Sequence, residues 1–293
     1  MEALAGTVVV DFTRYLPGPF ASRELLERGA RVVRVEPPDG DPLRAVAPGW
    51  HTALNGGKET VVWDRERDPN LGSALCASAD VVLEGFRPGV ADRLGIGPAD
   101  VPESVVYCSI TGFGAGDRRA GHDLNYVGWA GLLAETAPAV PPVQVADLAG
   151  GALYAVVEIL AALLERQRTG RGRRIMVSMT HNAHRLVAHR LHGEPERTLT
   201  GGLACYRIYA TADDRFLTVS PLEPKFWRRL CELLGREDLV ARQYAPDQEA
   251  LARELAEIFR AQPLAEWLEL FDGEDVMVGP VATLKEAATS FGG

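Results

Sequence analysis

A histidine and two aspartates supply the side chains that proton transfer would need in this sequence. His122 and Asp123 stand side by side in "AGHDLNYVGWAGLL", just where apolar residues take over, and Asp147 stands in "VQVADLAGGALYAVVEILAALLERQRTGRG". Imidazole titrates near neutral pH and a carboxylate accepts protons, so both side chains suit general acid–base chemistry. A fold that brought the two segments to one pocket would place two proton-transfer groups there.

Both candidates also have structural explanations. Asp147 comes directly before a long apolar helix, where aspartate commonly serves as an N-cap, and capping is compatible with catalysis. A lone histidine such as His122 is more often a structural residue than a base. The pair Gly150-Gly151 favours a functional interpretation, because glycines let a ligand approach the backbone where a helix amino terminus attracts negative charge.

Two further patterns do not predict a site. The glycines of "TGFGAGD" follow an expected strand but lack the GxGxxG spacing, so we do not expect dinucleotide binding. Nearby arginines and a linker-like composition favour a solvated segment over a metal site for a group of four histidines: His181, His184, His189 and His192. We therefore expect no metal.

The elements that must position these residues alternate between strands and helices. The expected strands are "TVVVDF", "ARVVRVEP", "ETVVWD", "ADVVLEGF" and "SVVYCSITGFG". The clearest connecting helix, "PFASRELLERGA", follows Pro17-Gly18-Pro19 and stops at Gly29. This alternation predicts an α/β domain with a parallel sheet, in which residues 148–168 form a buried helix.

The pattern changes after "RRIMVSM". Histidines, arginines, prolines and glycines there are typical of a linker or an exposed helix. Farther on, "YRIYAT", "RFLTVS" and "GPVATL" indicate strands, whereas "KFWRRLCELLG" and "EALARELAEIFRAQ" indicate amphipathic helices. We expect a large domain over residues 1–180, a linker over 181–203 and a smaller α+β domain over 204–293.

Length and composition exclude several classes of protein. The 293 residues are 46% hydrophobic and 24% charged, as in ordinary globular proteins. No apolar run reaches the roughly 20 residues of a bilayer span, and the start lacks a basic leader, so we expect a cytoplasmic protein without a membrane partner. Scattered cysteines without CxxC spacing favour reduced thiols. A net charge of −9 opposes binding to nucleic acid but permits a local basic pocket.

Several stretches are familiar as a set and together span nearly the whole chain: "DFTRYLPGPFASRELLERGARVVRVEPP", "LNGGKETVVWD", "LEGFRPGVADRLGIGP", "YCSITGFG", "AGHDLNY", "ADLAGGALYAVVEILAALLERQRTGRG" and "PLEPKFW". The set resembles the class III CoA-transferase superfamily of CaiB/BaiF type and, within it, the α-methylacyl-CoA racemases. This resemblance implies a Rossmann-like large domain, a smaller second domain and an intertwined homodimer with active sites between subunits. It also implies an acyl-CoA substrate whose coenzyme A part enters with it, and no tightly bound cofactor.

The same resemblance assigns roles to individual residues. In the racemase branch, His122 and Asp147 are the two bases that move the α-proton of a 2-methylacyl-CoA thioester through an enolate, and Glu223 in "PLEPKFW" orients the histidine. Asp123 and Tyr126 match pocket residues. Arg87 in "GFRPGV" is the expected contact for the CoA phosphates, because a guanidinium forms paired charged hydrogen bonds with phosphate.

Further contacts with the acyl-CoA are expected from Lys58, with Arg44 as another cation for the phosphates, and from the backbone at Gly150 and Gly151.

Two alternatives stay open. In transferases of the superfamily, the aspartate that corresponds to Asp147 is a nucleophile that forms an acyl anhydride and then an aspartyl-CoA thioester. Asp147 therefore does not decide the branch, whereas His122 and Glu223 favour a racemase. Relatives also continue past "GPVATLKEAA" with a segment that returns to the large domain, while this sequence stops at Gly293. A noncatalytic acyl-CoA-binding homologue is therefore the third hypothesis.

Overall fold

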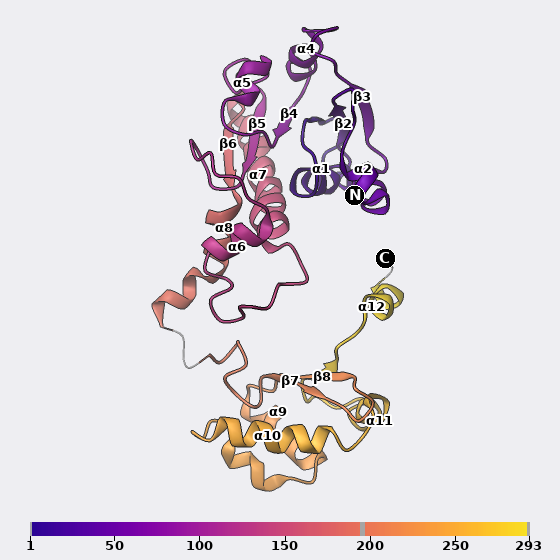
Figure 1. Ribbon diagram of the computed structural model, residues 1–293, viewed down its shortest axis with the longest axis vertical. Helices are drawn as coiled ribbons and strands as arrows, with labels where there is room; N and C mark the ends of the chain where they lie inside the picture. The colour runs from indigo at the N-terminus through magenta and orange to yellow at the C-terminus, as the bar shows by residue number, and fades with distance from the viewer. Residues whose placement is uncertain (1, 194–196, 292–293) are drawn as a thin grey trace. The chain divides into compact units, whose positions relative to one another are not determined.

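The computed structural model describes residues 2–193 and 197–291 and divides the chain into two compact units (Figure 1). The first unit ends at Leu191 and the second begins at His192. Residues 194–196 of the expected linker, together with residue 1 and residues 292–293, lie outside the described residues. Each unit has its own hydrophobic core.

A six-stranded sheet in the order β3-β2-β1-β4-β5-β6 forms the centre of the first unit. Every neighbouring pair is parallel, so the carboxyl ends of all the strands lie along one edge. The strands are β1 (Val8–Asp11), β2 (Arg31–Glu36), β3 (Glu59–Val62), β4 (Val81–Glu84), β5 (Val106–Thr111) and β6 (Arg174–Ser178). The expected α/β class with a Rossmann-like parallel sheet is confirmed.

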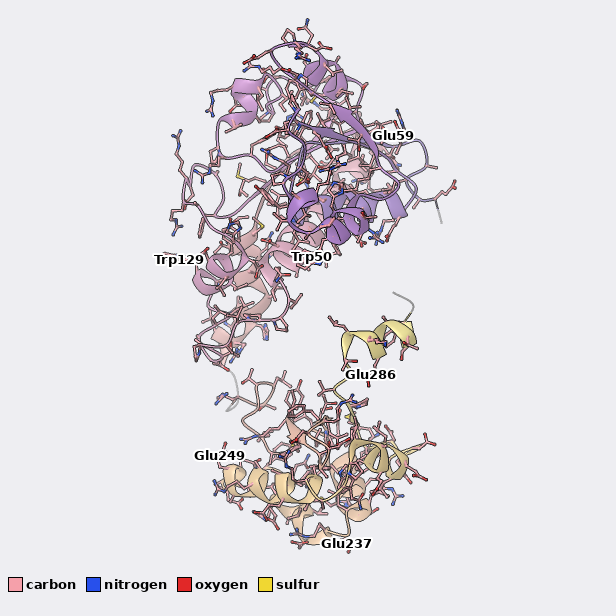
Figure 2. The ribbon with its side chains drawn as sticks, turned by 45° about the vertical axis from the view of Figure 1, so that its right-hand side comes forward. Trp50, Glu59, Trp129, Glu237, Glu249 and Glu286 are labelled. Atoms are coloured by element: carbon pink, nitrogen blue, oxygen red, sulfur yellow. The ribbon has the colours of Figure 1, made fainter. Side chains whose placement is uncertain are left out.

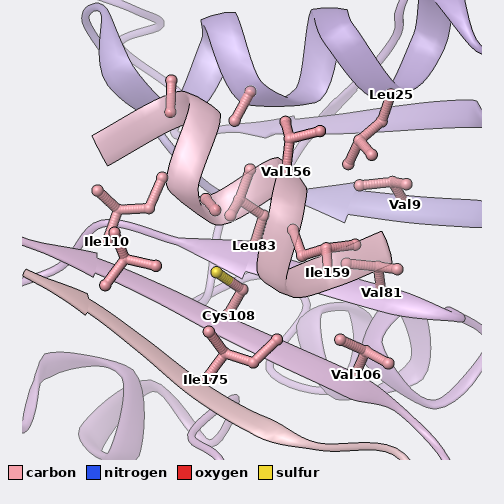
Figure 3. Close-up of a cluster of buried hydrophobic side chains, with 14 of the residues drawn as sticks. Val9, Leu25, Val81, Leu83, Val106, Cys108, Ile110, Val156, Ile159 and Ile175 are labelled. Atoms are coloured by element: carbon pink, nitrogen blue, oxygen red, sulfur yellow. The ribbon is translucent and has the colours of Figure 1, made fainter. Parts of the chain in front are cut away.

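Helices cover both faces of this sheet. On one face lie α1 (Pro17–Glu27), the π-helix η1 (Ala146–Leu153) and α7 (Tyr154–Thr169). Figure 3 shows Leu25, Val156 and Ile159 from these helices packed against strand residues such as Val9 and Val81. On the other face, α4 (Leu71–Ala77) and α5 (Val90–Leu94) pack against alternate strand residues. Strands buried on both faces need apolar residues at nearly every position, which explains runs such as "TVVVDF".

The apolar helix expected over residues 148–168 differs from the expectation in its start and its burial. It begins at Ala146 as η1 and ends before Gly170, whose φ of +70° suits a left-handed helix stop. Asp147 therefore lies inside the first turn, and Val145 holds the N-cap position. One side is open, because Leu153, Val157 and Leu164 are 44–62% exposed. The expected burial is therefore confirmed for the side that faces the sheet and not for the opposite side.

The same segment also corrects the expectation about membrane-length runs. Ala146–Thr169 is long and apolar enough to cross a membrane by length and composition, with a mean hydropathy of 1.8 over an 18-residue window. The prediction rested on uninterrupted apolar residues, and Asp147 and Glu158 interrupt this segment. The core helix of a sheet meets the same criterion, and this helix packs in the core of the first unit (Figure 3).

Helix α8 (Met179–Val187) includes the first residues of the expected linker but packs within the first unit. It lies against η1, where a Cβ added at Gly150 would be 2.7 Å from the Met179 carbonyl oxygen. Only glycine permits this approach, and the Asn182 side-chain amide donates to the Gly150 carbonyl oxygen at 2.9 Å. The division of the chain at Leu191 thus falls inside the predicted linker rather than at its start.

The rest of the first unit consists of short helices: α2 (Leu43–Val46), α3 (Pro48–Asn55) and α6 (Asp123–Trp129), with the 3-10 segment η2 (Ala188–His192) at the boundary of the units.

The second unit combines a three-stranded antiparallel sheet, in the order β7-β8-β9, with helices. Trp227, Leu251 and Phe259 lie at the centre of its core. Its elements are β7 (Arg207–Ala210), β8 (Phe216–Val219), α9 (Pro224–Leu233), η3 (Glu237–Arg242), α10 (Gln248–Phe259), α11 (Leu264–Leu270), β9 (Val278–Pro280) and α12 (Leu284–Phe291). This is the α+β organisation expected from the sequence, although "GPVATL" supplies only the last two residues of β9.

Candidate active site

A cavity of about 460 Å³ opens at the carboxyl ends of β4 and β5. Arg87 enters its wall from the turn after β4, and Phe113 enters from the loop after β5. The following loop and α6 complete the wall with Asp117, Arg118, Arg119, His122, Asn125 and Tyr126. Ligands of open parallel sheets bind at this edge, so we take this cavity as the candidate active site.

His122 lies in the wall of the cavity as the N-cap residue of α6, with extended backbone angles of −120° and 176°. Its backbone N–H donates to Oδ1 of Asn125 at 3.0 Å. Its carbonyl oxygen accepts from the backbone N–H groups of Asn125 and Tyr126 at 2.9 and 3.2 Å. These bonds fix the direction in which the chain enters the helix, and they hold an exposed imidazole at the cavity.

Asp147 reaches this region through Asp123, the residue after His122. Oδ1 of Asp123 accepts a hydrogen bond from the backbone N–H of Asp147 at 2.9 Å. Burial, and then the negative charge of Asp123, raises the pKa of Asp147 to about 7. A carboxyl group that titrates near neutral pH can both accept and donate a proton. Asp147 itself is not one of the residues that line the 460 Å³ cavity.

Tyr126 lies between the loop that precedes His122 and the region of Asp147 and Arg87. Its ring is buried, and its hydroxyl donates to the Gly121 carbonyl oxygen at 2.5 Å. Burial raises its pKa, with a further contribution from the negative charge of Asp147 and an opposing one from Arg87. A Cβ at Gly112 or Gly121 would lie 2.6 or 2.7 Å from the ring, so glycine is needed at both positions. Tyr126 is therefore the packing centre of the wall.

Arg87 presents a free guanidinium to the cavity. The residue is exposed, and within the described ranges no carboxylate pairs with it. The turn that carries it is fixed by the buried Glu84, whose Oε2 accepts from the Phe86 backbone N–H at 2.7 Å. Burial raises the pKa of Glu84. A fixed turn with an unpaired cation fits the expected contact with an anionic ligand.

Lys58 does not occupy the expected ligand-binding position. Its side chain is fully buried, and Nζ donates to the Pro19 carbonyl oxygen, to Ser22 Oγ and to Asn55 Oδ1 at 2.8, 2.8 and 3.0 Å. Asp11 lies 3.8 Å away, and burial lowers the pKa of Lys58 to about 8. All three donors of the ammonium are occupied within the protein, so the expected contact between Lys58 and the substrate was wrong.

Four other expected residues lie in different settings. Arg44, the alternative cation, pairs with Glu36 at 2.6 Å. Packing against α8 accounts for Gly150 and Gly151, so ligand approach to their backbone stays a prediction. Glu223 is the exposed N-cap residue of α9 in the second unit, and its orienting role toward His122 stays a prediction as well.

A second cavity, of about 420 Å³, lies along the same edge of the sheet. Its wall contains Arg14 after β1, Pro37 after β2 and Trp63 after β3, and it shares Phe86 with the first cavity. The residues of this cavity were not predicted as site residues, nor were Phe113, Arg118, Arg119 and Asn125 of the first. Their common signal is position, because most of them follow the carboxyl end of a strand or lie in the loop that leads to α6, and Asn125 lies in the first turn of α6.

The described residues contain no group of three side chains suited to a metal ion. The four cysteines are free and buried: Cys76, Cys108, Cys205 and Cys231.

Comparisons with known proteins agree on one family. A family model described as CoA-transferase family III matches residues 4–291. Alpha-methylacyl-CoA racemase from Mus musculus is 33% identical over 97% of this chain and 79% of its own length. A probable fatty acyl-CoA transferase from Mycobacterium tuberculosis is 32% identical over 97% of this chain and 84% of its own. A crystal structure of this mycobacterial protein aligns with a TM-score of 0.86 at 30% identity and covers 98% of this chain and 85% of that one.

Proposed function

The chain belongs to CoA-transferase family III, and from this membership we propose that it is an α-methylacyl-CoA racemase. The resemblance seen in the sequence motifs is thereby confirmed at the level of the family. The similar proteins include a racemase and a probable acyl-CoA transferase, so family membership supports acyl-CoA chemistry in general. The choice between the two reactions rests on the candidate active site.

One observation carries the racemase proposal: a histidine and an unpaired arginine line the same cavity. His122 supplies a base, and Arg87 supplies a cation for the phosphates of coenzyme A. The neighbour of His122, Asp123, holds the backbone of Asp147, the second base. A transferase that works through an aspartyl intermediate needs the carboxylate but has no use for the histidine.

The proposed reaction moves one proton in two steps. One base removes the α-proton of the thioester and leaves an enolate, and the other base returns a proton to the opposite face of the same carbon. Negative charge on the enolate oxygen requires hydrogen-bond donors, which backbone N–H groups near Asp147 would supply. A pKa of Asp147 near 7 suits both roles, because the protonated and the ionised forms coexist at neutral pH.

The test follows α-deuterium incorporation into a 2-methylacyl-CoA in D₂O, starting from each epimer separately. We expect exchange from both epimers and racemisation in the wild-type protein. His122→Ala should abolish exchange from one epimer and Asp147→Ala from the other, and neither variant should racemise. A wild-type protein that binds the thioester but exchanges no α-proton would overturn the proposal.

A CoA-transferase is the second candidate, and the partly buried carboxyl group of Asp147 favours it. This carboxylate would attack the thioester carbonyl, release the CoA thiolate and form an acyl anhydride, which the thiolate converts to an aspartyl-CoA thioester and a free acid. Hydroxylamine should then trap an aspartyl hydroxamate at Asp147, and His122→Ala should leave the trapping intact. Trapping without α-proton exchange would establish the transferase, and binding with neither signal would indicate a noncatalytic acyl-CoA-binding homologue.

A further inference from the structure

The side chain of Arg119 makes several contacts within the loop that precedes His122 and with the elements beside it. Its guanidinium lies 4.0 Å from the centroid of the Phe113 ring and 4.6 Å from that of Trp129. Arg119 also bonds to Asp117 through Nε and Nη2, at 3.1 and 2.7 Å. Phe113 follows β5 and Trp129 ends α6, so this cluster connects the loop to the elements on both sides of it. We call these four residues the Arg119 clamp.

The ends of the loop are fixed by a different contact. Gly112 and Gly121 both pack against the ring of Tyr126, and the Gly121 carbonyl oxygen accepts from its hydroxyl. The Tyr126 ring also meets Phe113 edge-on, with centroids 5.2 Å apart. His122 directly follows Gly121. Its position therefore depends on Tyr126 at the ends of the loop and on the clamp in the middle.

Arg119 differs from the other arginines of the cavity wall in its ion pairing. Three arginines line the cavity: Arg87, Arg118 and Arg119. Arg119 is the one with a carboxylate partner, Asp117, among the interactions of the described residues. A guanidinium that is paired and stacked on rings has fewer donors left for a ligand, so its contribution lies in the geometry of the loop.

The clamp acts on one side of the site. The carboxylate of Asp147 is carried by η1, which packs against α8 through Gly150 and Gly151. None of the four clamp residues belongs to η1 or α8, although Trp129 ends α6, which contacts both elements. Loosening the clamp should therefore displace His122 more than Asp147, because Asp147 keeps the packing of η1 against α8.

We propose that Arg119 is a positioning residue whose clamp holds the imidazole of His122 in place at the cavity. Arg119 would then govern proton transfer by His122 far more than proton transfer by Asp147. This inference rests on the proposed racemase function. Figure 2 labels Trp129 at the surface of the first unit, where it is 69% exposed. The clamp can therefore be altered without opening the hydrophobic core.

The test measures α-proton exchange in D₂O from each epimer for Arg119→Met, which keeps an unbranched stem and removes the charge. Exchange from the epimer assigned to His122 by His122→Ala should fall at least tenfold. Exchange from the other epimer and the affinity for CoA should change less than twofold. Arg119→Lys should recover part of the loss, because lysine keeps the charge over the rings. Equal losses from both epimers, or no loss, would overturn the proposal.

A matched control and a readout without substrate complete the design. Arg31→Gln removes another exposed arginine with two bonds to one carboxylate, that of Glu59, and should leave both exchange rates unchanged. Amide hydrogen exchange over residues 112–125 should accelerate in Arg119→Met and stay the same in Arg31→Gln. Unchanged amide exchange in Arg119→Met would overturn the clamp itself. Absence of α-proton exchange in the wild-type protein would instead overturn the racemase function on which the positioning role depends.

Discussion

At the scale of single residues, the chemistry of the site depends on what surrounds each carboxyl group. Asp147 is partly buried beside another aspartate, and both effects favour its protonated form. Asp117, by contrast, is ionised beside Arg119, which lowers its pKa. The same side chain thus titrates near neutral pH in one position and is a fixed ion in the other.

The raised pKa of Asp147 predicts a pH-dependent cost to stability. Its pKa moves from an ordinary value of 3.8 to about 7 on folding, so between these values the folded protein binds more protons than the unfolded chain. Stability from this group is therefore lost as the pH rises from 4 to 7. The shift corresponds to about 4 kcal/mol at most, which partial exposure reduces.

Asp147→Asn removes this ionisation and should make the protein more stable than wild type at pH 8, by about 2–3 kcal/mol. At pH 4 the two proteins should differ little. Urea unfolding at both pH values checks the prediction. A difference that is the same at pH 4 and pH 8 would show that the carboxyl group is not perturbed.

Arg87 offers a second prediction at this scale. Arg87→Ala should weaken CoA binding by about 1.5–3 kcal/mol, the usual worth of hydrogen bonds to a charged group. Isothermal titration calorimetry with CoA measures the loss, and Arg93→Ala, on α5 and outside the cavity wall, is the control. Equal affinity of Arg87→Ala and wild type would place the phosphate contact elsewhere, and the second cavity with Arg14 would be the next site to examine.

At the scale of elements, the contact between η1 and α8 depends on the absence of a side chain at Gly150. A Cβ at Gly150 would meet the backbone of α8, which cannot move aside as a flexible side chain can. Gly150→Ala should therefore destabilise the protein by about 1–3 kcal/mol, as other overpacked sites do. Gly49→Ala is the matched control, because a Cβ in helix α3 at Gly49 meets nothing within 4 Å.

Denaturant unfolding of Gly150→Ala and Gly49→Ala measures the difference in their stability. An Ala variant at Gly150 as stable as the one at Gly49 would mean that the close approach of η1 and α8 is not required.

Strands with a continuous apolar run could be predicted from the sequence. A helix whose burial depends on residues far away in the chain could not. "TVVVDF" and "ADVVLEGF" could be assigned to buried strands because a parallel sheet imposes its pattern on every residue. Residues 181–187 were predicted as part of a linker or an exposed helix, since the partner that makes them a packed helix, the Gly150-Gly151 pair, lies far away in the chain.

In the candidate site too, residues within motifs could be predicted, whereas contacts that depend on the fold could not. His122, Asp147 and Arg87 were selected from motifs, and two of them line the cavity. Lys58 was misassigned because the sequence does not show that Asp11, Ser22 and Asn55 surround its ammonium group in the fold. Arg119 was overlooked, because ring stacking with Phe113 and Trp129 depends on the fold of the loop.

At the scale of the whole molecule, both units leave apolar side chains uncovered. In the first unit these include Leu153, Val157 and Leu164 on one side of the apolar helix, and in the second Ile208 and Phe216 on the sheet. Exposed apolar surface of this kind is typical of association sites. We predict a homodimer in which the segment over residues 180–202 joins the units and wraps the partner.

Light scattering at micromolar concentration should give twice the mass of the 31.7 kDa chain. Val157→Glu should shift the mass toward the monomer, because a charge on the open side of α7 opposes association. A wild-type monomer at this concentration would contradict the prediction.

The strand order has a consequence for synthesis on the ribosome. The centre of the sheet, β1, is made first, yet β5 obtains its outer neighbour only when β6 emerges more than sixty residues later. Until then the nascent chain carries an uncovered strand edge at β5, and η1 lacks the α8 surface against which Gly150 packs, and both invite aggregation. Translation that pauses shortly before Arg174 should therefore recruit chaperones most strongly, and release from them should coincide with the arrival of α8.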